Sequence, residues 1–270
     1  MESNSVTVNI TRDYGRHSYE VLVRIGSLED APELIEQVSP AYRYALITDS
    51  QVGELYGKKL LKSLHDRGLK TELFTFAAGE WNKTREVWAK VTDYLVAANM
   101  GRDTTVIALG GGVVGDLAGF VAATYMRGVP VVQIPTTLLA MVDSSVGGKT
   151  GIDTRAGKNL VGAFHQPGLV IVDPGVLKTL PMHQLSAGMA EVAKHGLICD
   201  AEYFELVEAR IEGLLARDLD LLSTVIRRSI EIKAEVVSRD EKESGYRRIL
   251  NFGHTVAHAL EAVTGYELLH

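Results

Sequence analysis

Short runs of apolar, mostly β-branched residues alternate with amphipathic helical patterns over roughly the first two thirds of the chain. The apolar runs predict strands at Arg43–Asp49, Thr71–Phe76, Thr104–Leu109, Val129–Ile134 and Leu169–Val172. Helical periodicity over residues 52–67 and 83–98 separates the first of them. Because nearly continuous apolar strands are typical of sheets buried on both faces, the pattern predicts a parallel sheet covered by helices.

The pattern changes near residue 180, where strand-like runs become rare and helical periodicity takes over through residues 183–264. A boundary in the stretch Pro174–Pro181 predicts an α/β plus all-α fold. A Rossmann-like parallel-sheet domain would cover residues 1–178, and a helical metal-binding domain residues 179–270. A cleft between the two is where ligands usually bind. Residues 265–270 have the pattern of a further helix beginning, which predicts that the second domain is incomplete.

Composition restricts the class of protein. The 270 residues are 46% hydrophobic and 23% charged, which is typical of soluble globular proteins. The net charge of −6 counts against a nucleic-acid partner, and no apolar run approaches the ~20 residues of a membrane span. The first residues lack the basic and apolar parts of a secretory signal. Because Cys199 is the single cysteine and cannot form an internal disulfide, we expect a cytoplasmic protein.

A glycine-rich segment, Ala108–Gly119, follows a predicted strand and opens a predicted helix. Glycines at such a junction let the backbone approach a diphosphate, whose charge is met by amide groups at the helix N-terminus. The spacing differs from the usual dinucleotide fingerprint, so a tight turn with close packing remains an alternative. Asp49 could accept a hydrogen bond from a ribose hydroxyl or simply cap a helix. Thr136 and Thr137 could likewise serve the same cofactor or cap the next helix.

Several cations lie in glycine-containing or helical segments. The segment Asp143–Thr150 lacks the first glycine of a phosphate-binding loop, which excludes a P-loop nucleotidase. Its glycine pair before Lys149 still suggests a lysine that reaches towards an anion, and Gly157–Asn159 is similar in character. The other cations in question are Lys233, Arg247 and Arg248. If they converge on a cleft, they would bind a carboxylate or a phosphate.

A metal site is suggested by His254 and His258, which lie four residues apart on an apolar helical pattern and so share one face. A third imidazole, His270, follows a break at Gly265, and the carboxylate of Glu191 lies in another apolar helix. One carboxylate and two imidazoles would leave a zinc-type ion an open position for substrate. The alternatives are a polar helix–helix contact for the histidines and a surface ion pair with Lys194 for Glu191.

Taken in order, several segments of the chain resemble the 3-dehydroquinate synthase family. The resemblance extends from Asp49 to the last residue. Each segment is modest evidence alone, and their order along the chain is specific. The segments are Gly79-Glu80 with Lys83, Gly110–Asp116, Pro135–Thr137, Asp143–Lys149, Gly157–Pro167, Ala190–Lys194 and Leu250–Thr255.

The resemblance implies an enzyme of the shikimate pathway, a phosphate-eliminating carbon–oxygen lyase that depends on NAD and on zinc, or alternatively on cobalt. Its substrate would be the sugar phosphate 3-deoxy-D-arabino-heptulosonate 7-phosphate, and its products 3-dehydroquinate and phosphate. The implied steps are transient oxidation of a ring hydroxyl, elimination of phosphate, re-reduction and intramolecular aldol closure. A homodimer is expected.

The resemblance also implies the residues of the site. NAD would be held by Asp49, Glu80, Lys83, Gly112, Val113, Val114, Gly115, Asp116, Thr136, Thr137 and Thr179, with Asp143, Lys149 and Lys158 placed where cofactor and substrate meet. Substrate binding and catalysis would fall to Arg127, Lys149, Asn159, Lys194, Lys233, Arg247 and Asn251, with His258 handling protons. The zinc ligands would be Glu191, His254 and His270. The resemblance therefore implies His270 as the second imidazole ligand, in place of His258, which the i+4 spacing suggests.

Three other functions remain open. They are a sister cyclase that forms an inosose or a valiolone, a metal-dependent polyol dehydrogenase, and a non-catalytic NAD- and metal-binding module. Asn251, with Lys233 and Arg247 upstream, favours the dehydroquinate branch. Family members continue beyond the position of His270 with another basic substrate contact. A chain that ends there is therefore expected to bind zinc weakly and to have little or no activity.

Overall fold

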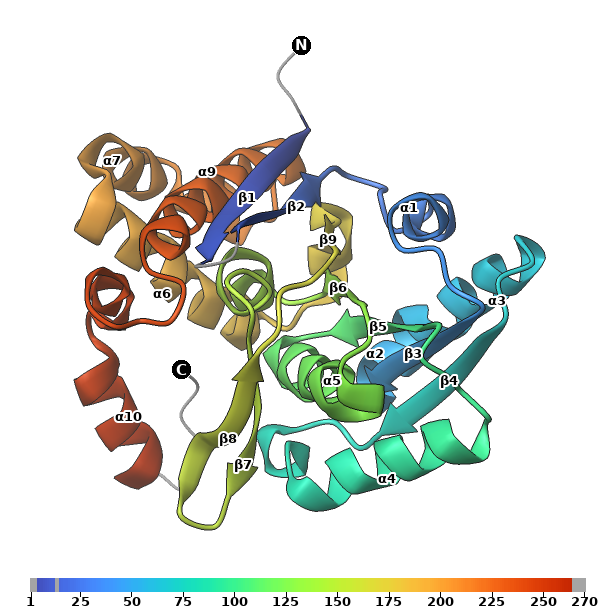
Figure 1. The fold of residues 1–270 in the computed structure, drawn as a ribbon. Coiled ribbons are helices and arrows are strands. Elements are labelled where there is room, and N and C mark those ends of the chain that lie inside the picture. Colours follow the sequence, from blue (N-terminus) through green and yellow to red (C-terminus); the bar gives the residue numbers. More distant parts are fainter. Residues whose placement is uncertain (1–3, 13–14, 264–270) are drawn as a thin grey trace.

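A computed structural model describes residues 4–12 and 15–263 of the chain. Within these residues a seven-stranded sheet lies at the centre, in the order β1-β2-β9-β6-β5-β3-β4 (Figure 1). The strands are β1 (Ser5–Arg12), β2 (Gly15–Val23), β3 (Arg43–Asp49), β4 (Thr71–Phe76), β5 (Thr104–Gly110), β6 (Val131–Pro135) and β9 (Leu169–Val172).

The sheet is parallel from β2 to β4, and β1 pairs antiparallel with β2 at one edge. The five predicted strands are confirmed, and β3, β4 and β9 have the predicted bounds. The edge pair β1–β2 is not among the predicted strands. Its apolar residues alternate with polar ones, so Val8 and Ile10 are buried while Thr7 and Asn9 are exposed. This alternation with a period of two is the sequence signal from which the two strands could have been predicted.

Helices cover both faces of the sheet because successive residues of each buried strand point to opposite faces. On β3, Tyr44 and Leu46 pack with α1 (Ala31–Val38) and α3 (Lys58–Asp66). Ala45 and Ile47 face the other way and pack with α4 (Arg85–Ala97) and α5 (Gly112–Thr124). The predicted helix over residues 52–67 is divided into α2 (Ser50–Val52), the π-helical turn η1 (Gly53–Gly57) and α3.

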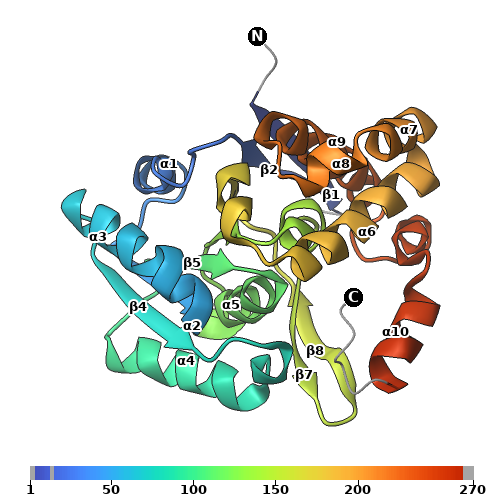
Figure 2. The same ribbon diagram turned by 180° about the vertical axis from the view of Figure 1, so that it is seen from behind.

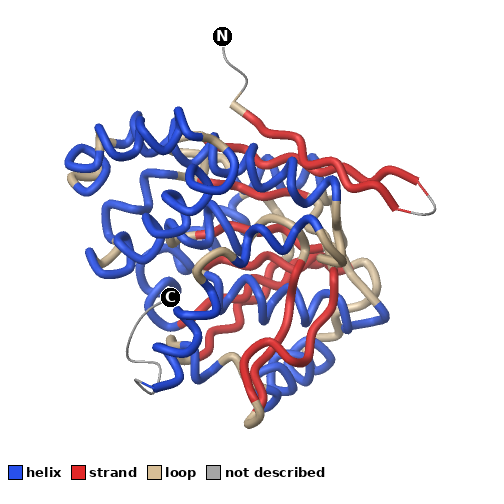
Figure 3. Tube along the Cα trace, turned by 90° about the vertical axis from the view of Figure 1, so that its left-hand side faces the viewer, coloured by secondary structure: helices blue, strands red, loops and turns tan. Residues whose placement is uncertain are grey.

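The C-terminal third is helical, as predicted, and its helices over residues 182–239 gather beside β1 and β2 (Figures 2 and 3). Buried residues of β1, β2 and β9 share one core cluster with residues of the helices from α6 to α9. This core therefore continues from the sheet into the helices, and the boundary at residues 178/179 stays a prediction. The helical elements are η5 (Pro174–Thr179), α6 (Met182–Cys199), α7 (Ala201–Ala209), α8 (Ile211–Leu215), α9 (Leu219–Arg239), η6 (Tyr246–Asn251) and α10 (His254–Val263).

A separate antiparallel hairpin, β7 (Lys149–Thr154) and β8 (Gly157–Phe164), projects from the sheet domain opposite α10 (Figure 1). It follows the π-helical turn η4 (Ala140–Ser144). The hairpin packs on α5, where a side chain at Gly119 would overlap Thr150. The two lysine-containing segments expected to bind anions therefore belong to one strand pair.

Among the described helices, none combines the length and the apolar character needed to cross a lipid bilayer.

Candidate active site

The glycine turn lies between β5 and α5, at the edge where the parallel strands β3, β5 and β6 end. A Cβ at Gly110 would overlap the side chain of Val114, and one at Gly111 would lie 3.0 Å from Thr137. The glycines therefore form a tight, closely packed turn, and diphosphate binding at this turn stays a prediction. No side chain caps the first turn of α5 within the described residues, so its amide groups face this edge.

Of the polar side chains at this edge, two cap helices, and the hydroxyl of a third makes no hydrogen bond within the described residues. Asp49 accepts hydrogen bonds from two amides in the first turn of α2, at 2.8 and 2.9 Å. Thr137 accepts one from the amide of Ala140 at 3.1 Å. Thr136 is buried, and its hydroxyl has no hydrogen-bond partner among the described residues. An unsatisfied buried hydroxyl beside a glycine turn fits a nucleotide cofactor.

A buried ammonium group, that of Lys83, forms the centre of a second cluster. Its Nζ lies 2.9 Å from Glu80, 3.3 Å from Asp116 and 3.6 Å from Asp153. Lys158 on the hairpin reaches within 3.7 Å of Glu80. Residues predicted to bind NAD from the η2 turn (Glu80–Asn82), α5 and β8 are thus brought together, and Asp153 joins them without having been predicted.

Burial and the neighbouring charges shift the pKa values of this cluster in different directions. Burial acts to lower the pKa of Lys83, but Asp116 and Glu80 raise it above its usual value. Burial raises the pKa of Asp116 to about 6, although Lys83 opposes this. For Glu80, burial is outweighed by Lys83, and its pKa is lowered.

A third cluster joins the sheet to the helical region through two ion pairs. Lys233 on α9 donates to the Oδ1 of Asp143 at 2.6 Å and to the carbonyl oxygen of Asp143 at 2.5 Å. Lys194 pairs with Glu191 one turn earlier on α6. The side chains of Lys194 and Glu191 are only 7% and 6% exposed, so the alternative of a surface ion pair is wrong. Burial is opposed by Lys233, which holds the pKa of Asp143 below its usual value.

His195 completes this cluster and is fully buried. Neither ring nitrogen has a hydrogen-bond partner among the described residues, and burial lowers the pKa of the ring to about 3. His195, Asp143 and Glu191 each offer one donor atom, and the three atoms lie within 4.8 Å of one another. Two carboxylates and a neutral imidazole fit the ligand preferences of zinc. His195 is not among the residues predicted for the site, although its i+4 spacing from Glu191 is a usable sequence signal.

A fourth group joins the hairpin to η6. Lys149 pairs with Glu243, and the amide of Asn251 donates to the same carboxylate at 2.5 Å. The buried guanidinium of Arg247 donates to the carbonyl oxygens of Gly147, at 3.2 Å, and of Glu241, at 2.5 Å. Three residues predicted to contact substrate are therefore near one another, and Glu243, which no sequence pattern marks, connects two of them.

Other predicted residues are not brought to these clusters. Arg127 is exposed and follows the end of α5 that is distant from the glycine turn. Thr179 donates or accepts a hydrogen bond with Tyr56 at 2.6 Å. His254 is partly exposed at the start of α10. The side chain of His258, and all of His270, lie outside the described residues. The zinc ligand set therefore stays a prediction.

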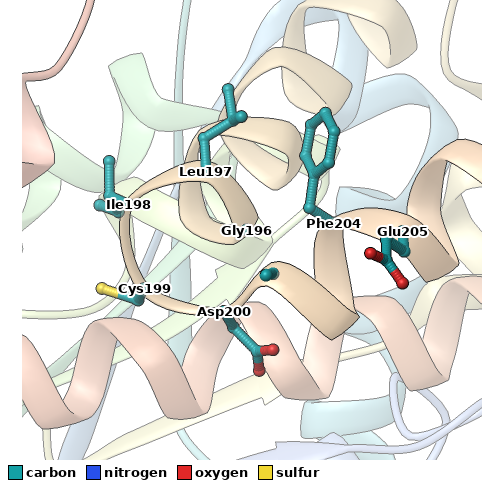
Figure 4. Close-up of a pocket in the computed structure, with 8 residues that line it drawn as sticks. Gly196, Leu197, Ile198, Cys199, Asp200, Phe204 and Glu205 are labelled. Atoms are coloured by element: carbon teal, nitrogen blue, oxygen red, sulfur yellow. The ribbon is translucent and has the colours of Figure 1, made fainter.

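Two pockets lie near the C-terminal end of α6. One of about 310 Å³ is formed where α6 meets α7, with Leu197 and Phe204 pointing to the same side and Cys199 pointing away (Figure 4). The other, of about 450 Å³, is lined by Leu197, Ile198 and four residues of η6 and its end, Asn251 among them. Asn251 is the only residue of the predicted site that lines either of these two pockets.

Comparison with known proteins supports one family. The model of the 3-dehydroquinate synthase N-terminal domain matches residues 73–187, and that of the C-terminal domain matches residues 188–270. A curated 3-dehydroquinate synthase of Symbiobacterium thermophilum is 51% identical over 96% of this chain and 72% of its own length. The chain thus spans about 72% of that relative.

Solved structures agree with this relationship. ValA, the 2-epi-5-epi-valiolone synthase of Streptomyces hygroscopicus subsp. jinggangensis 5008, solved with NAD+ and Zn2+, is 35% identical with a TM-score of 0.87. The superposition covers 94% of this chain and 71% of ValA. A 2-deoxy-scyllo-inosose synthase, solved with carbaglucose-6-phosphate, NAD+ and Co2+, is 28% identical with a TM-score of 0.87, covering 96% and 70% of the two chains. On the family models and the curated relative together, this chain belongs to the 3-dehydroquinate synthase family.

Proposed function

We propose that this chain converts 3-deoxy-D-arabino-heptulosonate 7-phosphate into 3-dehydroquinate and phosphate, as an NAD- and zinc-dependent carbon–oxygen lyase. The observation that carries the proposal is the convergence of Lys194, Lys233 and Arg247, all buried, around the carboxylates Asp143 and Glu191. Several buried cations in one region suit a substrate with both a carboxylate and a phosphate. The 51% identity to a curated 3-dehydroquinate synthase supports this substrate over those of the sister cyclases.

NAD, when bound, would supply reversible oxidation of one ring hydroxyl of the sugar. The glycine turn and the amides of α5 would hold its diphosphate, and Thr136 offers a buried hydroxyl there. Glu80, Lys83 and Lys158 would contact the cofactor from the neighbouring cluster. Asp49 and Thr137 would also contact NAD while they cap their helices.

Zinc, or cobalt in its place, would supply Lewis-acid polarisation of the oxygens at the reacting carbon. Glu191 is the ligand common to both arrangements that the chain offers. One arrangement pairs it with His254 and His270, and the other with Asp143 and His195. We propose the first, because it is the set that the family resemblance implies, with Asp143 left to its ion pair with Lys233.

The side chains of the site would bind, orient and exchange protons. Lys194, Lys233 and Arg247 would bind the anionic groups of the substrate and stabilise negative charge that develops on the enolate oxygen. Asn159 and Asn251 would orient the sugar, and His258 would hold or move a proton at a ring hydroxyl. Because the lysines and Arg247 are buried, the reacting groups are screened from bulk water, which strengthens these interactions.

The test is an assay of the full-length protein with NAD, zinc and the seven-carbon sugar phosphate, in which released phosphate and the absorbance of NADH are followed together. The proposed lyase releases phosphate without net NADH. Glucose 6-phosphate is assayed beside it, because one neighbour was solved with carbaglucose-6-phosphate. Glu191→Gln is the inactive control, and Glu208→Gln, at an exposed carboxylate of α7, is the matched active control.

The outcomes separate the candidate functions. Preferred turnover of glucose 6-phosphate would assign a sister cyclase, and net accumulation of NADH would assign a dehydrogenase. Binding of NAD and metal with no turnover of either sugar would contradict the proposal. We also propose a cytoplasmic homodimer, to be measured by light scattering coupled to gel filtration.

A further inference from the structure

The hairpin β7–β8 contains an irregularity at the point where it meets the Lys83 cluster. Ile152 pairs with Val161, whereas Thr154 pairs with Gly157. A single residue of β7, Asp153, therefore lies opposite three residues of β8, residues 158–160. Extra residues on one strand form a bulge that redirects side chains, and bulges are over-represented next to active sites.

Asp153 stabilises the bulge by hydrogen bonds from its backbone and to its side chain. Its backbone amide donates to the carbonyl oxygen of Lys83 at 2.7 Å instead of across the hairpin. Its Oδ1 accepts a hydrogen bond from the backbone amide of Asn159 at 2.9 Å, six residues later. The same oxygen lies 3.6 Å from the ammonium group of Lys83, and the side chain is only 16% exposed. Asp153 thus joins the bulge to the Lys83 cluster by backbone and side chain.

Asn159 needs such support because its backbone is left-handed, with φ at +56°. A residue other than glycine in this region costs free energy, and it persists where its surroundings hold it. The Oδ1 of Asp153 satisfies the amide that the bulge removes from the strand ladder. Asn159 is thereby presented at the surface of the hairpin, while Lys158 beside it extends to Glu80.

We propose that Asp153 is a positioning residue for substrate binding, because its carboxylate holds the bulge that places Asn159 against the sugar phosphate. This inference rests on the proposed role of Asn159 as a substrate contact. Loss of the Asp153 carboxylate should affect the position of Lys83 less, because Lys83 has closer partners in Glu80, at 2.9 Å, and Asp116, at 3.3 Å. Asp153 is therefore expected to act on the substrate side of the site and not on the cofactor side.

The test compares Asp153→Ala with Asp153→Asn, which keeps an oxygen that can accept the Asn159 amide. In Asp153→Ala, KM for the sugar phosphate rises about tenfold, whereas in Asp153→Asn it stays within about threefold of the original. The Kd for NAD+, measured by direct titration, stays within about threefold in both variants. Hydrogen exchange of the Asn159 amide becomes fast in Asp153→Ala alone. Thr154→Ala, which removes the turn contacts of an adjacent hydroxyl, is the matched control and leaves KM unchanged.

Several results would overturn the inference. One is an unchanged KM in Asp153→Ala, and another is an equal rise of KM in Asp153→Asn. A Kd for NAD+ that rises together with KM would show that the residue supports the whole region and not the substrate contact. If Asp153→Ala does not fold, Asp153→Ser takes its place, because its shorter side chain does not reach the Asn159 amide. Absence of phosphate release or NAD+ binding in the original chain would instead reject the proposed function.

Discussion

The buried charged residues of this protein form two kinds of cluster, one with more carboxylates than buried ammonium groups and one with equal numbers of both. Around Lys83, three carboxylates share one buried ammonium group. Around Asp143 and Glu191, each carboxylate has its own lysine. In the first arrangement burial raises the pKa of Asp116, and the neighbouring carboxylates add to the rise, whereas in the second Lys233 keeps Asp143 ionised.

The first prediction concerns Asp116, whose pKa burial raises to about 6. Between the unfolded pKa of ~3.9 and this value, the folded protein binds the proton and the unfolded chain does not. The contribution of Asp116 to stability is therefore largest below pH ~4, declines as the pH rises to about 6, and is a constant penalty above it. Asp116→Asn removes this decline.

Relative to the original protein, Asp116→Asn should therefore gain about 2 kcal/mol in the free energy of unfolding between pH 4 and pH 7. Urea unfolding of both proteins at several pH values measures the difference. Asp93→Asn, at an exposed carboxylate of α4, is the control and should show no such gain. A difference that does not change with pH would contradict the prediction.

The second prediction separates the two metal arrangements that share Glu191. Titration with Co2+, followed by its d–d absorption, should show no binding in Glu191→Gln and at least ~10-fold weaker binding in His254→Ala. His195→Leu should bind Co2+ within about threefold of the original, because the proposed set does not include it. Weak binding in His195→Leu, with normal binding in His254→Ala, would place the ion between Asp143, Glu191 and His195.

At the scale of secondary-structure elements, local pattern predicts most of the sheet but not the hairpin. The five predicted strands are apolar runs flanked by loops and helical patterns, and they are confirmed. Strand β7 and strand β8 include three glycines and several polar residues, so their sequence indicates loops. They form strands because β7 packs on α5 at Gly119, a contact between distant segments.

The third prediction concerns α9, the 21-residue helix that carries Lys233. Its N-cap is Asp218, which accepts hydrogen bonds from the amides of Asp220 and Leu221 at 3.1 Å. Asp218→Ala should lower the free energy of unfolding by about 1 kcal/mol, because two amides lose their acceptor. Asp218→Asn retains the acceptor and should lose much less.

Chemical denaturation measures these changes, with Asp220→Ala as the control. Asp220 lies in the same first turn and bears the same charge, but it caps no amide in the described hydrogen bonds. Equal losses in Asp218→Ala and Asp220→Ala would show that charge near the helix terminus, and not the cap, sets the stability.

At the scale of the whole molecule, the sheet and the helices are joined by a shared core and by charged pairs. The core that contains β1 and β2 extends into the helices from α6 to α9. The pair between Asp143 and Lys233 spans the same junction from η4 to α9. The candidate site therefore lies where the two parts of the chain pack together, and its stability depends on both.

The fourth prediction tests this link by a double-mutant cycle. Asp143→Asn should lower the free energy of unfolding by about 3 kcal/mol, because it leaves the buried ammonium group of Lys233 without its partner, and Lys233→Met should lower it less, because Asp143 is partly exposed. The double variant should lose clearly less than the sum, since neither charge remains. Additive losses would show that the pair is not coupled.

The ion pair between Asp143 and Lys233 should also make the free energy of unfolding depend on pH. The pKa of Asp143 is below its usual value, so its contribution is present above pH ~4 and is lost as the pH falls through the lower folded value. The loss of stability on acidification should therefore be smaller in the double variant than in the original protein, as measured by thermal unfolding.

The sequence by itself determined the parallel sheet, the helical C-terminal third, the glycine turn and the family, because these depend on residues that are neighbours in the chain. It also predicted a set of site cations, through segments whose order is specific to one family. Only the tertiary structure decided which charges meet. Lys233 and Asp143 are 90 residues apart in sequence, and Lys149 and Glu243 are 94 apart. Asp153 and His195 acquire their significance from packing, because burial and the geometry of a bulge arise only when distant segments come together.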